Sequence, residues 1–526
     1  MSIMLHDISY HHSNRTVLFQ GLNCIINTGT HVNLVGNNGS GKSTLLKIMA
    51  KALAPSSGTV SVSATPYYVP QQTVWLPEQT MADALHVSQP LQALQAILKG
   101  DTSAENFDLL ADRWDIEERI QQALANWQLD HLHHNTPMHQ LSGGEQTRLL
   151  LAGMELHQHS IILLDEPTNH LDARGRAQLH HFLHQFKGDA VIVSHDRALL
   201  QLSHQTLELH NGKLESFGGN YEHYKLMKKE KMQALQHAVH HQEKELKAVR
   251  KQAQQAKEKR QKQEGRGNRQ SGLPKIVANS LRNMAENSTA KMQSVHDNKI
   301  QETTANLQQQ REELGKEQIL KLIIPGSLLH KGKKLVQGKN VNHKYDQQTL
   351  WKDDLQFLIT SGDRIAIRGH NGSGKTSLLK MIMGELQPTT GVIEKATFSH
   401  IRLDQHYSML QPELTVVEQL QQYDHLHQPP HLLKILLHRH QLGIDHWDKK
   451  CHQLSGGERM KLSLCCLAVS SAHPDLVILD EPGNNLDIRS LEILTESINA
   501  YEGTLLVVSH DSQLISDLGI EQFIDL

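Results

Sequence analysis

The chain has 526 residues, four cysteines and a formal net charge of −3. This length exceeds a single hydrophobic core and suits two α/β units of roughly 200 residues with a connector between them. No run approaches the ~18 consecutive apolar residues that span a bilayer, and the first ten residues lack the charged head and apolar run of a secretion signal. The four cysteines show no paired metal-ligand spacing, and so few thiols in so long a chain suit a reducing compartment. We therefore expect a cytoplasmic protein without a membrane span.

The beginning of the chain alternates β-type runs, glycine-rich turns and helix-forming stretches. Apolar runs at 24–26 and 31–35 lead into the turn GNNGSGKST at 36–44, and a helix-forming stretch follows. This order of strand, loop and helix is the context that a phosphate-binding loop requires. Further short apolar runs at 161–164 and 190–193 are typical of strands buried on both faces. We therefore predict an α/β fold with a mostly parallel sheet covered by helices.

The same motifs occur a second time, in the same order. The turn GHNGSGKTS at 369–377 repeats the first loop, LSGGEQ at 141–146 returns as LSGGER at 454–459, and ILLDEPTNHLD at 162–172 returns as VILDEPGNNLD at 477–487. In both copies a VSHD segment follows, so that Asp165 precedes His195 by 30 residues and Asp480 precedes His510 by 30. This is an internal duplication. The stretch between Gln71 and Ser142 is longer than the matching stretch between Gln405 and Ser455 in the second copy. The additional residues, near 94–117, predict a helical element inserted in the first copy.

The segment between the copies is basic and helix-prone. Residues 225–335 hold 24 lysines and arginines against 11 acidic residues, a balance that attracts polyanions. Residues 225–263 contain no Gly or Pro, and apolar residues recur on three- and four-residue steps that Gln242 interrupts. The breakers Gly265, Gly267, Gly272 and Pro274 then end the predicted helix. A second helical stretch, 285–322, has apolar residues seven apart. The apolar positions are Met232, Leu235, Val239, Leu246, Val249, Ala253 and Ala256 in the first stretch and Ile300, Leu307 and Leu314 in the second.

We interpret this segment as an antiparallel helical hairpin. The tip of the predicted hairpin, residues 265–275, carries Arg266, Arg269 and Lys275 and no acidic residue. A solvated charged spacer is the alternative, but a flexible tether needs neither an apolar seam nor a basic tip. The pattern therefore favours contact with a polyanion.

The two glycine-rich loops predict paired nucleotide sites. Glycines let the backbone wrap phosphates with its N–H groups, and the following helix N-terminus favours anions. Lys42 and Lys375 would neutralise the β- and γ-phosphates, while Ser43 and Thr376 would offer hydroxyls to Mg²⁺. The candidate nucleotide-binding residues of the loops are Gly36, Asn37, Gly39, Ser40, Gly41, Lys42, Ser43 and Thr44, and Gly369, Asn371, Gly372, Ser373, Gly374, Lys375, Thr376 and Ser377.

Carboxylates at strand ends supply the candidate catalytic chemistry. Asp165 and Asp480 end apolar strands and would hold Mg²⁺ at the carboxyl edge of the sheet. The next residues, Glu166 and Glu481, are candidate general bases for an attacking water, or alternatively further carboxylates near the metal. The side-chain amides of Gln71 and Gln405 could contact Mg²⁺ or the attacking water. The imidazoles of His195 and His510 could donate a hydrogen bond to the γ-phosphate.

The tetrad SGGE offers a hydroxyl and bare backbone amides ahead of a helix. A second phosphate binder suggests a composite site closed from the opposite face. Tyr10 and Tyr345 precede their loops and would stack on adenine or pack in the core. The candidate tetrad residues are Ser142, Gly143, Gly144 and Glu145, and Ser455, Gly456, Gly457 and Glu458.

These motifs together resemble the ATP-binding cassette (ABC) superfamily, and the two cassettes with a basic helical linker are similar to its ABC-F subfamily. The resemblance implies two P-loop ABC ATPase domains, at 1–224 and 336–526, joined by an antiparallel helical-hairpin linker at 225–335. It also implies a monomer whose cassettes close head-to-tail over two ATPs, so that Lys42 shares a nucleotide with Ser455 and Lys375 with Ser142. Members of that family bind the ribosomal tRNA exit site, which would place the tip residues near rRNA or tRNA.

Several functions remain open on this sequence. The expected one is a ribosome-bound ATPase that regulates or rescues translation and releases after hydrolysis. Displacement of ribosome-targeting antibiotics, energising a membrane transporter and DNA maintenance are the alternatives. The second copy departs from the family pattern, with Gly483 and Asn485 where the first has Thr168 and His170, and this predicts unequal ATP sites.

Overall fold

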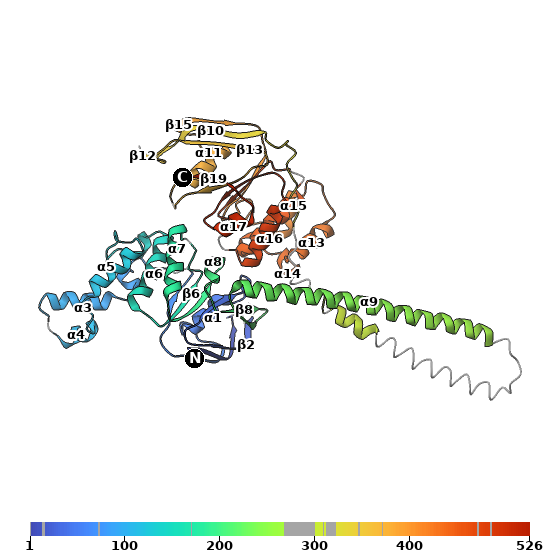
Figure 1. Ribbon diagram of the computed structural model, residues 1–526, viewed down its shortest axis with the longest axis horizontal. Coiled ribbons are helices and arrows are strands. Elements are labelled where there is room, and N and C mark those ends of the chain that lie inside the picture. The colour runs from blue at the N-terminus through green and yellow to red at the C-terminus, as the bar shows by residue number, and fades with distance from the viewer. Residues whose placement is uncertain are drawn as a thin grey trace. The chain divides into compact units, whose positions relative to one another are not determined.

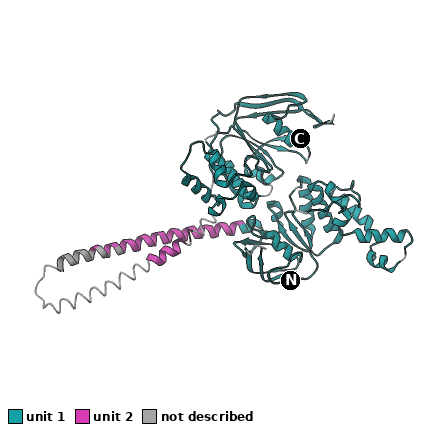
Figure 2. Ribbon diagram, turned by 180° about the vertical axis from the view of Figure 1, so that it is seen from behind, with its two compact units in different colours: residues 1–224, 320–526 teal, residues 225–319 magenta. Residues whose placement is uncertain are grey.

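The structure is a computed structural model of the chain, shown in Figure 1. It describes residues 2–12, 16–71, 74–101, 103–169, 171–267, 300–308, 310–311, 322–345, 348–370, 372–470, 473–483 and 486–526, with backbone alone at 253, 256–257 and 259–267. The chain divides into two compact units, one of residues 1–224 and 320–526 and the other of residues 225–319 (Figure 2). Within the described residues, no helix has both the length and the apolar character needed to cross a membrane.

A six-stranded sheet carries the motifs of the first cassette. Its order is β5-β6-β7-β3-β8-β9, and neighbouring strands run parallel except for the last pair. Every residue of β3, β6 and β7 is buried, as expected for parallel strands with helices on both faces. The strands are β3 (His31–Val35), β5 (Tyr67–Val69), β6 (Ile161–Asp165), β7 (Asp189–Val193), β8 (Gln205–His210) and β9 (Lys213–Gly218).

A second, antiparallel sheet stands beside it, in the order β2-β1-β4. Its strands are β1 (Ile3–His11), β2 (Val17–Ile26) and β4 (Ser57–Val62). The apolar run at 24–26 therefore belongs to this antiparallel sheet and not to the parallel one. A single apolar cluster joins the two sheets, because Ile3, Ile8 and Phe19 pack with Leu34 and Leu45 around the first helix.

Helices complete the first cassette. Those between β5 and β6, together with α7, form one apolar cluster with residues of β5, β6 and β7, and this cluster contains the fully buried Trp127. Helices α3 and α4 occupy the region in which the sequence predicts an inserted helical element. The helices are α1 (Lys42–Met49), α2 (Met81–Ala84), α3 (Ser88–Leu98), α4 (Ala104–Leu110), α5 (Ile116–Asn126), α6 (Gly143–His157), α7 (Ala173–Gln185) and α8 (Arg197–Leu200), with a 3-10 turn at Met138–Gln140.

The second cassette repeats this plan. A parallel sheet of order β16-β17-β18-β14-β19 stands beside an antiparallel sheet of order β13-β10-β15, and β11 and β12 form a short hairpin. The parallel strands are β14 (Arg364–Arg368), β16 (His400–Leu403), β17 (Leu476–Asp480), β18 (Thr504–Val508) and β19 (Gln522–Asp525). The antiparallel strands are β10 (Lys334–Asn342), β13 (Leu355–Thr360) and β15 (Thr390–Lys395), and the hairpin is β11 (Lys344–Tyr345) with β12 (Gln348–Thr349).

The helices of the second cassette follow the same plan, except that α13 and α14 stand between α12 and α15 where the first cassette has α3, α4 and α5 between α2 and α6. Thr415 and Ser455 cap two of them through reciprocal bonds with a glutamate three residues on, which satisfies backbone groups that a helix start leaves unpaired. The helices are α11 (Lys375–Met383), α12 (Val416–Tyr423), α13 (Pro430–Arg439), α14 (Ile444–Trp447), α15 (Gly456–Val469), α16 (Ile488–Asn499) and α17 (Ser512–Asp517), with a 3-10 turn at Cys451–Gln453.

The unit at 225–319 is built on α9 (Tyr221–Gly267), the long green helix of Figure 1. Its 47 residues make it about 70 Å long at 1.5 Å per residue. The helix includes Gly265 and reaches Gly267, where its described part ends. A glycine costs an interior helix position only about 1 kcal/mol, which the flanking Lys, Glu, Gln and Arg residues offset.

The seam expected of a hairpin is present where the structure describes it. Val239 and Leu246 of α9 form an apolar cluster with Leu307 and the partly buried Ile300. An ion pair of 2.5 Å between Arg311 and Glu243 joins the same two segments. Residues 300–308 are helical, whereas Leu322, the last residue of the second predicted stretch, lies outside any helix.

Candidate nucleotide-binding sites

Both glycine-rich loops have the backbone that phosphate binding requires. Gly39 and Gly41 have φ of 78° and 102°, and Gly372 and Gly374 have φ of 81° and 92°. A side chain at Gly41 would also collide with Leu18 and Phe19, since a Cβ there would lie 2.9 Å from Leu18 Cδ2. Only glycine combines this left-handed backbone with so close an approach. The loops therefore direct bare backbone toward the starts of α1 and α11.

The lysine of each loop folds back onto its own turn. Lys42 Nζ donates to the Gly36 and Asn37 carbonyls at 2.8 and 3.1 Å, and Lys375 Nζ donates to those of Gly369 and His370 at 2.9 and 3.1 Å. Burial lowers the pKa of both ammonium groups. These carbonyl contacts are ones that phosphate oxygens would replace with charge-assisted bonds.

The carboxylates of the first site converge at the ends of β6 and β7. Asp165 ends β6, and Glu166 follows with φ of 51°, a strained conformation for a residue with a side chain. Its backbone N–H donates to Val193 O of β7 at 2.8 Å, which fixes the turn. His195 Nε2 lies 2.9 Å from Glu166 Oε1, so the imidazole and the candidate base form one pair.

Electrostatics distinguish the two carboxyls of this site. Burial opposes ionisation of Glu166, yet His195 and Lys42 hold the pKa of its carboxyl below the usual value. Burial raises the pKa of Asp165, against the hydrogen bond from Ser43. Asp165 Oδ1 is buried and accepts no hydrogen bond from the part of the chain that the structure describes. A free carboxylate oxygen beside a hydroxyl is a donor set that fits Mg²⁺.

The second site has the same framework but different contacts. Glu481 has φ of 49° and its N–H donates to Val508 O at 2.8 Å, but His510 Nε2 is 3.5 Å from its carboxylate. The imidazole instead meets Lys375 Nζ at 3.0 Å. Burial and Lys375 lower the pKa of His510 to about 4, and burial raises the pKa of Glu481 to about 7. The two candidate bases therefore differ in charge near neutral pH.

The largest difference between the two sites is the partner of the aspartate that would bind Mg²⁺. Arg402 of β16 forms an ion pair of 2.6 Å with Asp480 Oδ2. In the first site the aspartate accepts instead from a phenol, because Tyr68 Oη donates to Asp165 Oδ2 at 3.3 Å. Sequence reasoning missed Arg402, since its partner is apparent only from the pairing of β16 with β17.

The SGGE tetrads form helix caps. Ser142 and Ser455 are the N-caps of α6 and α15, and each serine exchanges bonds with Glu145 or Glu458 in a capping box. The glutamates accept from the serine N–H and hydroxyl, while His131 and His446 lie within 3.2 and 2.9 Å of them. Their carboxylates thus hold the serines in place, and the free amides of the helix start are left for an anion.

Residues of both cassettes contribute to the first site. A cavity of about 400 Å³ is lined by Lys42, Ser43, Asp165 and Glu166, and Ser455 of the second cassette lines it too. Asp487, the N-cap of α16, accepts a hydrogen bond from Asn38 N at 2.8 Å. Arg197 and Asp517 add an ion pair of 2.5 Å between the cassettes. The site is therefore composite, with the first loop opposite the second tetrad.

The corresponding loop of the first cassette approaches the second site. Asp172, the N-cap of α7, interacts electrostatically with Lys375 and His510, and Arg176 of the same helix interacts with Glu481. The two cassettes thus face one another reciprocally, although the charges that each presents are not the same.

The remaining sequence candidates lie as follows. Gln71 lines the first cavity, and Gln405 occupies the matching place two residues beyond β16. Tyr10 packs against Phe19 with ring centroids 6.2 Å apart, and it is its neighbour His12 that lines the cavity. Tyr345 is half exposed, and its hydroxyl lies 3.2 Å from Ser377 Oγ.

Some residues that line the first cavity were not predicted, and some predicted residues lie outside the part of the chain that the structure describes. His12, Asn38 and Asn169 line the first cavity and were not among the predicted site residues. Asn38 and Asn169 lie within the motifs at 36–44 and 162–172, whereas no motif includes His12. Asn371, Arg269 and Lys275 lie outside the described residues, and Arg266 is described by its backbone alone. The expected contacts of these four side chains stay predictions.

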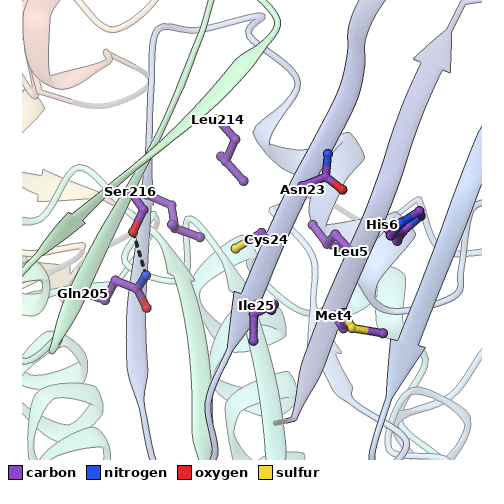
Figure 3. Close-up of a pocket in the computed structure, with 10 residues that line it drawn as sticks. Met4, Leu5, His6, Asn23, Cys24, Ile25, Gln205, Leu214 and Ser216 are labelled. Carbon is purple, nitrogen blue, oxygen red and sulfur yellow. Dashed lines mark hydrogen bonds between the residues drawn. The ribbon is translucent and has the colours of Figure 1, made fainter.

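Another cavity does not share this chemistry. A hollow of about 380 Å³ lies among β1, β2, β8 and β9, with Met4, Cys24 and Leu214 on its wall (Figure 3). Its polar contact is a hydrogen bond of 2.8 Å from Gln205 to Ser216, seen as the dashed line in Figure 3. Among the described residues that line this hollow there is no carboxylate, lysine or arginine, so the hollow lacks the groups that a nucleotide site needs.

Comparison with known proteins agrees with this geometry. The family model described as "ABC transporter" matches residues 19–169 and 352–484. "RNase-L Inhibitor" has a similar structure, with a TM-score of 0.58 and 20% identity over 99% of this chain and 87% of that one. The predicted fold class, α/β with two ABC domains in tandem, is confirmed.

Relatives match along nearly the whole chain. The ATP-binding protein Uup of Escherichia coli is 30% identical over 95% of this chain and 76% of its own length. The energy-dependent translational throttle protein EttA of the same species is 30% identical, over 92% of this chain and 84% of its own. The ribosome protection protein VmlR of Bacillus subtilis is 29% identical, over 97% and 84%.

Proposed function

Because this chain belongs to the ABC-F family of ATP-binding cassette proteins, we propose that it is an ATPase that binds the ribosome at the tRNA exit site and regulates or rescues translation. The observation that carries the proposal is the composite site, in which Ser455 lines the cavity of Lys42. A site shared by two cassettes couples ATP binding to their closure. The names of two relatives, a translational throttle and a ribosome protection protein, support the ribosome as the proposed partner.

Each residue of the first site has a role in this scheme. Lys42 and the start of α1 bind the phosphates, and the amides that Ser455 precedes close on the γ-phosphate from the opposite cassette. Glu166 takes a proton from the attacking water, and His195, 2.9 Å away, keeps its carboxylate ionised and oriented. Ser43, Asp165 and Gln71 would hold Mg²⁺, which neutralises charge on the transferred phosphoryl group when bound.

The cassettes at 1–224 and 336–526 act as the clamp, and the linker at 225–335 contacts RNA. Its excess of basic residues provides sequence-independent, salt-sensitive affinity, and Arg266, Arg269 and Lys275 would lie near rRNA or tRNA. ATP-bound closure would hold the protein on the ribosome, and hydrolysis would release it after a delay. The protein would act as a cytoplasmic monomer.

Sedimentation tests the proposal directly. The Glu166→Gln, Glu481→Gln double variant keeps its loops but lacks both bases, so ATP should lock it closed. We expect it to migrate with ribosomes through a sucrose gradient in ATP and to remain at the top in ADP. A Lys42→Ala, Lys375→Ala double variant, impaired in phosphate binding, is the matched control. Absence of ribosome association in both nucleotides would refute the proposal.

Protection from antibiotics is the second candidate function, and the similarity to VmlR favours it. In cell-free translation, addition of the protein with ATP would then restore synthesis inhibited by a drug that binds near the peptidyl-transferase region. Equal synthesis with and without the protein, across a panel of such drugs, would exclude this role and leave regulation or rescue.

A further inference from the structure

The two Mg²⁺-binding aspartates of the proposed sites have different partners, and the difference is built into the sheets. Tyr68 pairs with Leu163, two residues before Asp165, and Arg402 pairs with Ile478, two residues before Asp480. The side chains at 68 and 402 therefore occupy the same place relative to their aspartates. In the first site this place holds a neutral phenol, and in the second it holds a cation.

Charge decides what each aspartate offers a metal. Asp165 accepts a hydrogen bond of 3.3 Å from the Tyr68 hydroxyl, a neutral partner that brings no positive charge to the carboxylate. Asp480 is neutralised by Arg402 at 2.6 Å, with both side chains largely buried, at 15% and 23% exposure. A guanidinium is permanently charged and forms strong pairs with carboxylates. A divalent cation placed on the same carboxylate would meet both a neutralised ligand and a repelling charge.

The surroundings of the second site reinforce this asymmetry. Arg176 interacts with Glu481 across the cassettes, whereas the matching position of α16, four residues after its N-cap Asp487, is the apolar Leu491. The second site thus holds the guanidinium of Arg402 where the first holds a phenol, and Arg176, which also pairs with Asp196 at 3.5 Å, adds a second guanidinium near Glu481. Positive charge that a nucleotide normally obtains from the metal is already present on the protein.

We propose that Arg402 replaces part of the metal's role, so that the second site retains ATP without Mg²⁺ while the first site depends on it. This inference rests on the proposed ATP binding, and it adds that the two sites differ in whether they need Mg²⁺ to hold the nucleotide. Arg402 acts through Asp480 and is a positioning residue. The second nucleotide would then persist as a structural ligand of the closed clamp, while the first turns over.

Metal occupancy tests the idea without recourse to turnover. The full-length protein is loaded with the non-hydrolysable analogue AMP-PNP, bound nucleotide is counted by filter binding, and Mn²⁺ is titrated by electron paramagnetic resonance. We expect two nucleotides and one tightly bound Mn²⁺, with the second ion at least tenfold weaker, the scale on which outer partners alter metal sites. In EDTA, one nucleotide should remain bound.

Reciprocal variants assign the effect to the residue. Arg402→Tyr should give two tight Mn²⁺ ions and lose nucleotide retention in EDTA, whereas Tyr68→Arg should weaken the first ion at least tenfold. Tyr68→Phe, which removes the hydroxyl without adding charge, is the control and should keep one tight ion. If Arg402→Tyr does not fold, Tyr68→Arg still tests the idea.

The outcomes separate this inference from the proposed function. Two nucleotides with two equally tight Mn²⁺ ions in the unmodified protein would overturn the inference and leave the ATPase proposal standing. Tyr68→Arg with unchanged Mn²⁺ affinity would also overturn it. If neither nucleotide binds, both the inference and the proposed function are refuted.

Discussion

Replacing Gly483 with threonine should stabilise the second cassette. At the matching position of the first cassette, Thr168 is buried and its hydroxyl lies 3.3 Å from that of Ser194. The second cassette keeps the counterpart, Ser509, which accepts from Asp511 N at 3.1 Å as Ser194 accepts from Asp196 N at 3.0 Å. A Cβ added at Gly483 would be 3.9 Å from its nearest neighbours, so space for the side chain exists.

The expected gain follows from two effects. A new buried hydrogen bond contributes about 1 kcal/mol, and loss of glycine freedom in the unfolded chain adds about 0.5–1 kcal/mol. For a unit of this size a gain of about 1–2 kcal/mol corresponds to a rise in Tm of roughly 2–8 °C.

The assay is thermal unfolding of the full chain, with hydrogen exchange reporting on residues 476–512. Thr168→Gly is the matched control, and it should lower protection around residues 161–196 by a similar free energy. An unchanged or lower Tm for Gly483→Thr, with nucleotide binding intact, would refute the reasoning.

Three further predictions concern the sites and the pH response. Glu166→Gln should reduce ATP turnover at least tenfold more than Glu481→Gln does, because Glu166 is held ionised by His195 whereas the pKa of Glu481 is about 7; equal losses would contradict it. Asp487→Ala should destabilise the chain by about 1 kcal/mol, because the substitution removes the cap of α16. It should also weaken the binding of a fluorescent nucleotide, because the Asn38 N–H loses its acceptor. Asp487→Asn is the control and should retain the cap. Burial lowers the pKa of His440 to about 4, so the folded state binds fewer protons than the unfolded state and stability should fall as pH drops from about 6.5 toward 4. Allowing for partial solvent screening, the loss is up to roughly 2 kcal/mol. The His440→Leu variant should lack that component in melts at pH 7 and pH 5, and identical pH dependence would rule the histidine out.

Motifs could be placed from the sequence because they determine their own local geometry. A GxGK turn between a strand and a helix has few backbone solutions, and a capping box needs only a serine and a glutamate three residues on. Lys42, Asp165 and Ser142 therefore lie at the loop, strand end and helix start that their motifs predict.

Contacts that depend on tertiary pairing were less accessible. The antiparallel sheets escaped prediction because β1 mixes buried and exposed residues without a clear alternation, and β4 has exposed or half-buried residues only. Arg402 meets Asp480 only through the register of β16 on β17, and Asn38 meets Asp487 only across the cassettes. No local pattern encodes such pairs. The family resemblance indicated the facing of Lys42 and Ser455, but not the difference in charge between the sites.

The bond between Asn38 and Asp487 has a consequence for synthesis of the chain. The two residues are 449 positions apart, so the acceptor emerges long after the donor has been made. At about 5–20 residues per second, roughly 20–90 s separate them. During that interval the first cassette can fold, but its nucleotide cavity lacks the wall that Ser455 supplies. A nascent chain that has not yet reached Ser455 therefore cannot assemble the composite cavity, which becomes complete only after that part of the second cassette has been made.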